Sequence, residues 1–102
     1  MIPFKLIDES KFRDDSYNAE MIYDSPNFRI VAFYLRAGQE VSPHKVKPEV
    51  SMTILKGKGK LIAGDKQYDS KEGDIAVCGS MESHGFSATT DMILLAVIAP
   101  RP

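Results

Sequence analysis

The sequence predicts an all-β protein built from short antiparallel strands, arranged as a sandwich or barrel. Runs rich in β-branched and aromatic residues recur roughly every ten positions, with turn residues between them. Long stretches of helical periodicity are missing. The nearest candidate, residues 8–18, is mostly polar and equally consistent with coil. At 102 residues the chain is expected to form one domain, residues 1–102, with a core barrel over about residues 19–100.

The first two strands are expected on either side of a proline turn. Residues 19–23 form the first strand and residues 28–36 the second. The turn between them contains Pro26, whose ring presets the φ angle that a turn requires. Residues 37–43 are then expected to interrupt the strands.

Residues 50–56 alternate as a half-buried strand does, with Val50, Met52 and Ile54 on one face. A turn is expected at residues 57–59.

A hairpin is predicted over residues 60–69, because Gly64 and Asp65 can supply the positive φ angles of a tight turn. After a further turn at residues 70–74, the remaining strands are predicted over 75–78, 84–89 and 92–99.

The last strand, residues 92–99, is apolar on both faces, and residues 30–35 nearly so. A strand that is apolar on both faces is normally covered on both faces. In a small barrel one of these covers has to come from elsewhere, and the sequence therefore predicts a homodimer.

Composition narrows the class of protein. The net charge is −1 and is spread evenly along the chain, whereas a nucleic-acid-binding surface normally carries an excess of basic residues. The longest apolar run, residues 92–100, is far shorter than the roughly 20 residues of a membrane helix. The N-terminus does not read as a signal peptide, and Cys78 has no second cysteine to pair with. We expect a cytoplasmic protein with neither nucleic acid nor membrane as a partner.

Two segments carry motifs that resemble the cupin family. In "RAGQEVSPH" followed by "ILKGKGKL", Gly38, His44 and Gly57 have the spacing of the first cupin motif. In "KEGDIAVCGSMESH", Gly73 and His84 have the spacing of the second. The resemblance covers the whole chain and is to the small single-domain cupins. It implies a jelly-roll β-barrel, also called a double-stranded β-helix, of antiparallel strands with little helix.

The departures from these motifs imply a degenerate metal site. Val46 stands where the family has a second histidine, and Val50 stands where it has a glutamate. Of the four ligands that the family pattern implies, His44 and His84 remain. The second motif departs from the pattern at Gly79, Met81 and Ala88.

A divalent transition metal (Zn, Mn, Fe or Ni) is one possible cofactor, with His44 and His84 as ligands; otherwise no cofactor is expected. Glu49 is the nearest candidate for a carboxylate ligand. Neighbouring residues of a strand face opposite ways, so Glu49 is expected to point outward unless a bulge at Pro48 re-aims it. Cys78 is an alternative ligand, although a lone buried cysteine more often fills space as a small apolar side chain.

His44 and His84 are the only histidines in the chain, and both occupy motif positions, so we expect them to meet inside the barrel. The side chains expected around them are apolar: Val46, Val50, Met52, Ile54, Cys78, Met81, Phe86 and Met92 or Leu94. Apolar walls with a few polar groups are typical of a small-molecule pocket, although such residues can also simply fill a barrel. Two functions stay open: a small-molecule-binding protein that uses both histidines as polar contacts, and a metal-dependent enzyme of the dioxygenase or isomerase type.

Three charged positions near the motifs have expected roles. Asp74 is expected to accept backbone N–H groups in a turn. Glu82 either orients the imidazole of His84 or stays an exposed loop charge. Lys47, close after His44, is expected to face solvent near the mouth of the barrel.

Overall fold

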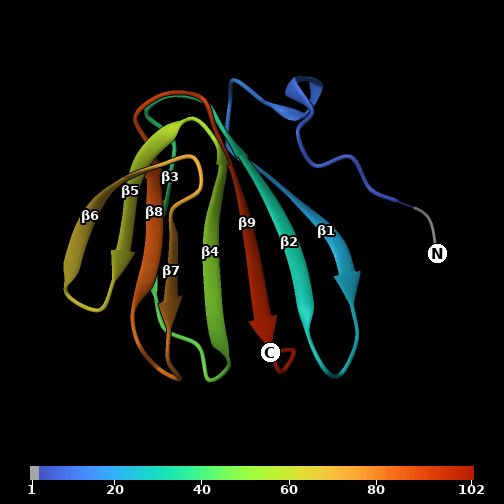
Figure 1. Cartoon of the computed structure of the whole chain (residues 1–102), viewed down its shortest axis with the longest axis vertical. Coiled ribbons are helices and arrows are strands. Elements are labelled where there is room, and N and C mark those ends of the chain that lie inside the picture. Colours follow the sequence, from blue (N-terminus) through green and yellow to red (C-terminus); the bar gives the residue numbers. More distant parts are fainter. Residues whose placement is uncertain (1–2) are drawn as a thin grey trace.

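The computed structural model describes residues 3–102, which form two antiparallel β-sheets packed face to face (Figure 1). Sheet A has the strand order β1-β2-β9-β4-β7, and sheet B has the order β3-β8-β5-β6. The strands are β1 (Asn18–Asp24), β2 (Arg29–Leu35), β3 (Glu40–His44), β4 (Glu49–Lys56), β5 (Lys58–Ala63), β6 (Lys66–Lys71), β7 (Ile75–Cys78), β8 (His84–Ala88) and β9 (Met92–Ala99). This architecture confirms the all-β prediction.

Residues 8–18 hold little helix. A single 3₁₀ turn, η1 (Glu9–Lys11), begins at Asp8, whose side chain accepts a hydrogen bond from the backbone N–H of Ser10. Among residues 3–102 there is no α-helix, and none of the described segments is a helix that could cross a lipid bilayer.

The main core lies between the two sheets. Val50, Met52 and Ile54 of β4 are buried there, as their alternation predicts. The rings of Phe33 in sheet A and Phe86 in sheet B meet edge to face, with centroids 5.0 Å apart. Each such side chain contributes about 1.5–3 kcal/mol when it is fully removed from water, so these contacts hold the two sheets together.

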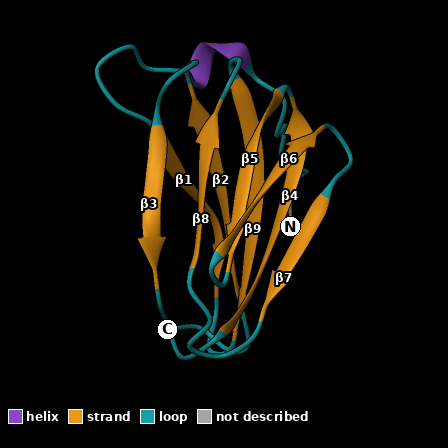
Figure 2. Ribbon diagram, turned by 90° about the vertical axis from the view of Figure 1, so that its left-hand side faces the viewer, coloured by secondary structure: helices purple, strands orange, loops and turns teal. Residues whose placement is uncertain are grey.

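Strand β3 corrects the expectation that residues 37–43 interrupt the strands. Figure 2 shows β3 at the edge of its sheet, beside β8. Pro43 lies within this strand, which an edge position tolerates because one side of the strand needs no N–H donor. The β3–β8 ladder is irregular between Val41 and His44, and this irregularity hides the strand from a period-two pattern.

The turns are tighter than expected. Strand β5 begins at Lys58, so the turn predicted at 57–59 reduces to Gly57. Strand β6 runs to Lys71, so the turn predicted at 70–74 begins only after that residue. Gly57 has a φ of 83°, and a Cβ there would lie 2.1 Å from the carbonyl oxygen of Asp91. The predicted hairpin turn forms at Gly64, with a φ of 65°.

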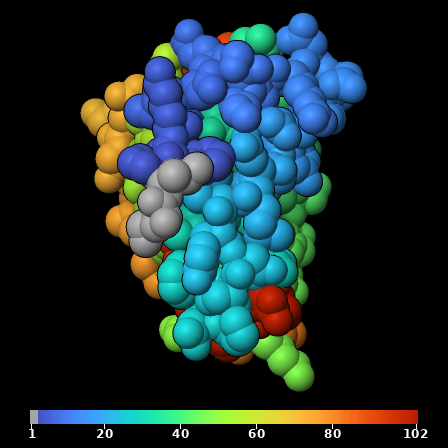
Figure 3. All heavy atoms as spheres, turned by 90° about the vertical axis from the view of Figure 1, so that its right-hand side faces the viewer, coloured from blue at the N-terminus to red at the C-terminus, as the bar shows by residue number. Residues whose placement is uncertain are grey.

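A second, smaller core covers the outer face of sheet A. Ala32, Tyr34 and Ile93 are buried there beneath Leu6 and Phe12 of the N-terminal segment, residues 3–17. The phenol of Tyr34 donates to the carbonyl of Leu6 at 2.7 Å. In Figure 3 the N-terminal segment lies against β1 and β2. One of the covers expected from another subunit is therefore supplied at this end by the chain itself.

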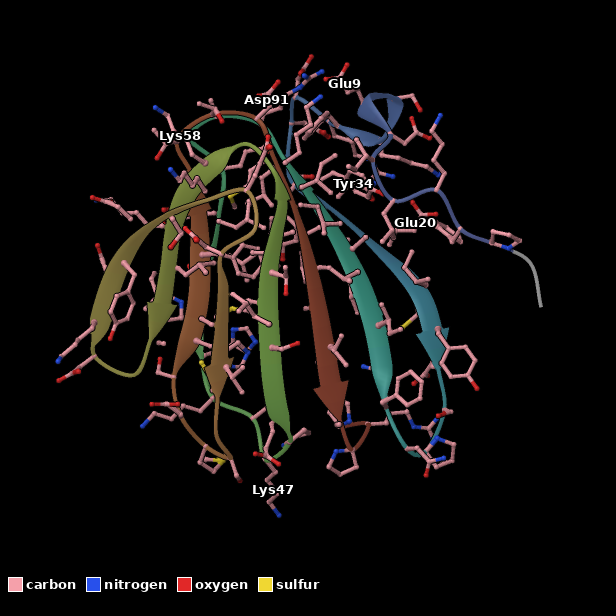
Figure 4. All side chains as sticks on the ribbon, viewed as in Figure 1. Glu9, Glu20, Tyr34, Lys47, Lys58 and Asp91 are labelled. Carbon is pink, nitrogen blue, oxygen red and sulfur yellow. The ribbon has the colours of Figure 1, made fainter. Side chains whose placement is uncertain are left out.

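Two ion pairs and a backbone hydrogen bond link residues at the end of the molecule where the N-terminal segment lies. The guanidinium of Arg36 binds Asp14 at 3.0 Å and Asp91 at 2.9 Å, and the backbone N–H of Ala37 donates to Asp91 at 3.0 Å. The N–H of Ala37, together with the guanidinium, lowers the pKa of Asp91. Figure 4 places Asp91 at one end of the molecule and Lys47 at the other, pointing away from the sheets as expected.

Candidate functional site: the paired histidines of β3 and β8

The two histidines lie side by side in sheet B. His44 ends β3 and His84 begins β8, and the two residues are partners in the antiparallel ladder. Their ring centroids are 4.3 Å apart, with the ring planes inclined at 57°. The expectation that these residues, forty positions apart in sequence, would meet is confirmed. They do not both lie inside the barrel as expected, because His44 is exposed.

The pair spans the boundary between core and solvent. The side chain of His84 is buried, with 5% of the residue exposed, whereas His44 is exposed.

Backbone carbonyls fix the tautomer of both rings. Nδ1 of His44 lies 3.1 Å from the carbonyl oxygen of Ser42, and Nδ1 of His84 lies 3.4 Å from that of Glu82. A carbonyl oxygen can only accept, so Nδ1 carries the proton in each ring. Each Nε2 then presents a lone pair and acts as a hydrogen-bond acceptor.

Burial keeps His84 neutral. Desolvation is the largest influence and lowers its pKa below the ordinary 6.5; the carbonyl of Glu82 opposes this, and the neighbouring His44 adds to it. At neutral pH the buried ring is an uncharged acceptor at Nε2.

The side chains expected around the histidines separate into three groups. Those buried in the main core are Val50, Met52, Ile54, Cys78, Phe86, Met92 and Leu94. Val46 is partly buried and packs against this core. Met81 is 52% exposed and has a φ of 63°, so it lies on the surface rather than among the buried residues.

The thiol of Cys78 is buried, and its pKa reflects that burial. Burial raises the pKa of its thiol, with a smaller contribution from the carboxylate of Glu82. The thiol therefore stays protonated at neutral pH, whereas a metal ligand has to be the thiolate.

The donor set around the histidines does not complete a metal site. Within the described range 3–102, no three histidine, cysteine or carboxylate side chains gather as a metal ion requires. Glu49 is exposed, and the irregularity in the β4–β9 ladder falls between Ile54 and Lys56 rather than at Pro48. The slot that the resemblance assigns to a carboxylate holds Val50, which is 3% exposed.

Backbone groups carry the part of the site that the sequence did not indicate. The carbonyls of Ser42 and Glu82 contact the two rings. Every residue has a backbone carbonyl, so the sequence does not indicate which of them contacts a histidine. The carboxylate of Glu82 instead accepts the N–H of Gly79 at 3.0 Å. Asp74 accepts the N–H of Lys71 at 2.9 Å, which confirms its predicted role in a turn.

A separate hollow opens between β6 and β7. Its volume is about 390 Å³, and it is lined by Leu61, Ala63, Tyr68, Ser70, Asp74, Ile75, Ala76 and Val77. Ala63 is the ladder partner of His84, so the hollow and the histidines adjoin the same part of sheet B.

Comparison with known proteins shows which solved structures share this fold. No family model matches the sequence, and no curated protein matches it. Among solved structures, an uncharacterised conserved protein with a double-stranded β-helix domain from Klebsiella pneumoniae is 18% identical. That match covers 96% of this chain and 91% of the other, with a TM-score of 0.81. Salicylate 1,2-dioxygenase from Pseudoaminobacter salicylatoxidans is 20% identical over 82% of this chain and 25% of its own, with a TM-score of 0.77. At these identities the two matches show the fold alone.

A third solved structure is closer in sequence. An RmlC-like cupin protein from Desulfovibrio desulfuricans is 33% identical, over 98% of this chain and 97% of the other, with a TM-score of 0.89. The strand order, the motif spacing and this near-complete match agree, and the protein belongs to the RmlC-like cupins.

Proposed function

We propose that this cupin binds a small organic molecule at the paired histidines. The single observation that carries the proposal is the contact of each Nδ1 with a backbone carbonyl oxygen, from which we infer that the Nδ1 atoms hold the protons and that both Nε2 atoms are acceptors. Such a pair favours a guest that donates, such as a hydroxyl group, over one that only accepts.

The surroundings of the pair support an apolar body for this guest. Phe86 lies on the same face of β8 as His84, two residues further along. Val46 is partly buried against the core that encloses Phe86. Apolar walls with a few polar groups that fix orientation are the usual form of a small-molecule site. The residues proposed for this site are His44, His84, Val46, Val50, Met52, Cys78, Met81 and Phe86.

The test compares phenol with benzoate, which share a ring but differ in hydrogen bonding. Phenol donates, whereas benzoate at pH 8 is an anion that only accepts. We expect millimolar phenol to shift the Nε2 signals of His44 and His84 in NMR spectra of metal-free protein, and benzoate to leave them unchanged. His44→Ala and His84→Ala should each weaken phenol binding about tenfold, the loss of roughly one hydrogen bond. Perturbations confined to Tyr68 and Ile75 would instead assign the guest to the hollow between β6 and β7.

The metal-dependent enzyme is the second candidate, favoured by the two lone pairs at Nε2, the atoms through which histidines commonly bind metals. It requires ligands beyond the two histidines, and Glu49 does not join them. Protein purified without chelator or affinity tag is analysed for metal by mass spectrometry. A near-stoichiometric transition metal that disappears in His44→Ala and His84→Ala would replace the binding proposal with the enzyme.

We also propose that a second copy of the chain covers the outer side of β7. Ile75 and Val77 are 60% and 66% exposed there, beyond the reach of the smaller core under the N-terminal segment. Light scattering after size exclusion should give a dimer for the wild type and a monomer for Val77→Asp. Met81→Asp, at another exposed apolar position, should leave the dimer intact. A wild-type monomer at micromolar concentration contradicts this proposal.

A further inference from the structure

Strand β3 is irregular where it pairs with β8 beside the histidines. Val41 pairs with Phe86 and His44 pairs with His84, so Ser42 and Pro43 together oppose the single residue Gly85. Two residues opposite one is a β-bulge. The bulge therefore sits immediately before His44 and determines where that imidazole is held.

The close approach depends on the missing side chain of Gly85. A Cβ at this position would lie 2.8 Å from the carbonyl oxygen of Val41, 2.9 Å from the nitrogen of Pro43 and 3.0 Å from its Cα. All three are backbone atoms, which cannot rotate aside as the end of a side chain can. The φ of Gly85 is not among the positive values of the chain, so alanine is opposed by contact and not by backbone conformation.

We propose that Gly85 is a positioning residue for the histidine pair: its lack of a side chain lets the β3 bulge rest on β8 and sets the spacing of the two rings. A methyl group there displaces Val41 and Pro43 by several tenths of an ångström, and His44 moves with the strand. His84 stays where the β5 ladder holds it. The inference rests on the proposed function only in that the rings contact the guest.

The test reads the ring spacing directly, in chelator-treated protein with no guest present. In the wild type, ring protons of His44 and His84 should give an NOE, as expected for centroids 4.3 Å apart. Gly85→Ala should weaken this NOE to roughly half, because the NOE falls with the sixth power of the distance between the protons and the strand moves by several tenths of an ångström. It should also weaken phenol binding about tenfold, the effect of roughly one hydrogen bond.

Two other glycines provide matched controls. A Cβ at Gly79 meets nothing within 4 Å, so Gly79→Ala should keep the NOE. A Cβ at Gly59 would lie 2.0 Å from the carbonyl oxygen of Ser87, in the β5–β8 ladder and not at the β3 bulge. Gly59→Ala should therefore destabilise the fold and yet keep the NOE in the molecules that remain folded.

If Gly85→Ala does not fold, the double variant Pro43→Gly/Gly85→Ala is measured in its place, because glycine frees the bulge to move aside. The rings should separate in this variant as well, whereas Pro43→Gly alone keeps them together. An NOE of wild-type intensity in either Gly85 variant, or a weakened one in Gly79→Ala, overturns the proposal. Separated rings with unchanged phenol binding would overturn the proposed function instead and leave the positioning role standing.

Discussion

Acid should destabilise this protein through the histidine pair, by an amount that its geometry sets. Two positive charges at the 4.3 Å centroid distance repel by about 1 kcal/mol in bulk water and about 4 kcal/mol at an effective dielectric constant of 20. Since His44 is exposed while His84 is buried, we expect a value near the lower end, about 1–2 kcal/mol.

The direction follows from the lowered pKa of His84. Above the unfolded-state pKa of about 6.5, both the folded and the unfolded chain hold this ring neutral, and the stability is fully present. As the pH falls from there through the lowered folded-state pKa, the unfolded chain takes up the proton more readily, and stability is lost.

The assay is thermal unfolding followed by circular dichroism at pH 8 and pH 4.5, for the wild type and His44→Gln. Other groups titrate in both proteins, so the measured quantity is the difference between their losses. With an unfolding entropy of about 2.1 cal/mol/K per residue, 1–2 kcal/mol corresponds to roughly 5–9 °C of additional Tm loss in the wild type. Equal losses in the two proteins would show that the rings do not repel each other and would refute the reasoning.

Three further substitutions test the packing of the fold. Tyr34→Phe removes the hydrogen bond to the N-terminal segment and should lower the free energy of unfolding by about 1 kcal/mol, seen as a Tm roughly 5 °C lower in calorimetry; the same change at Tyr68, 49% exposed, should have no effect. Asp91→Asn should lower stability by about 1 kcal/mol at pH 7 in urea titrations. That difference should fade as the pH falls through the lowered pKa of Asp91; a constant difference would contradict the ionic explanation. Met52→Ala, at a fully buried position, should lose about 2–5 kcal/mol in urea titrations, whereas Met81→Ala should stay within about 0.5 kcal/mol; similar values at both would contradict the core assignment.

Most of the strands could be predicted because their side chains alternate or because glycine marks their ends. Val50, Met52 and Ile54 share one face in the sequence and one core in the structure. Gly64 takes the positive φ that the hairpin required. Local chemistry determines such features, so a single sequence carries them.

Strand β3 and the cover over sheet A could not be predicted in the same way. A bulge interrupts the alternation of side chains in β3, and Pro43 is a residue more typical of a loop than of a strand. The N-terminal segment is largely polar, and its role depends on Leu6 and Phe12 reaching a face that distant strands create.

Part of the candidate site could be predicted from the sequence, and part depends on the folded backbone. The meeting of His44 and His84 followed from motif spacing, whereas their tautomers depend on carbonyls and their spacing on a residue with no side chain. Met81 was expected among the apolar walls; it is 52% exposed and lies between β7 and β8 with a φ of 63°. Strand periodicity says nothing about a residue beyond the strand.

The position of β9 has a consequence for how the protein is made. This strand, the last of the nine described, pairs with β2 on one side and β4 on the other, and it joins two otherwise separate parts of sheet A. In a nascent chain that has left the ribosome only as far as β8, β2 has only β1 as a partner and β4 has only β7. Sheet A therefore cannot be completed until residues 92–99 have emerged. Pairings between such distant segments place folding in the slow range of small domains, roughly milliseconds to seconds.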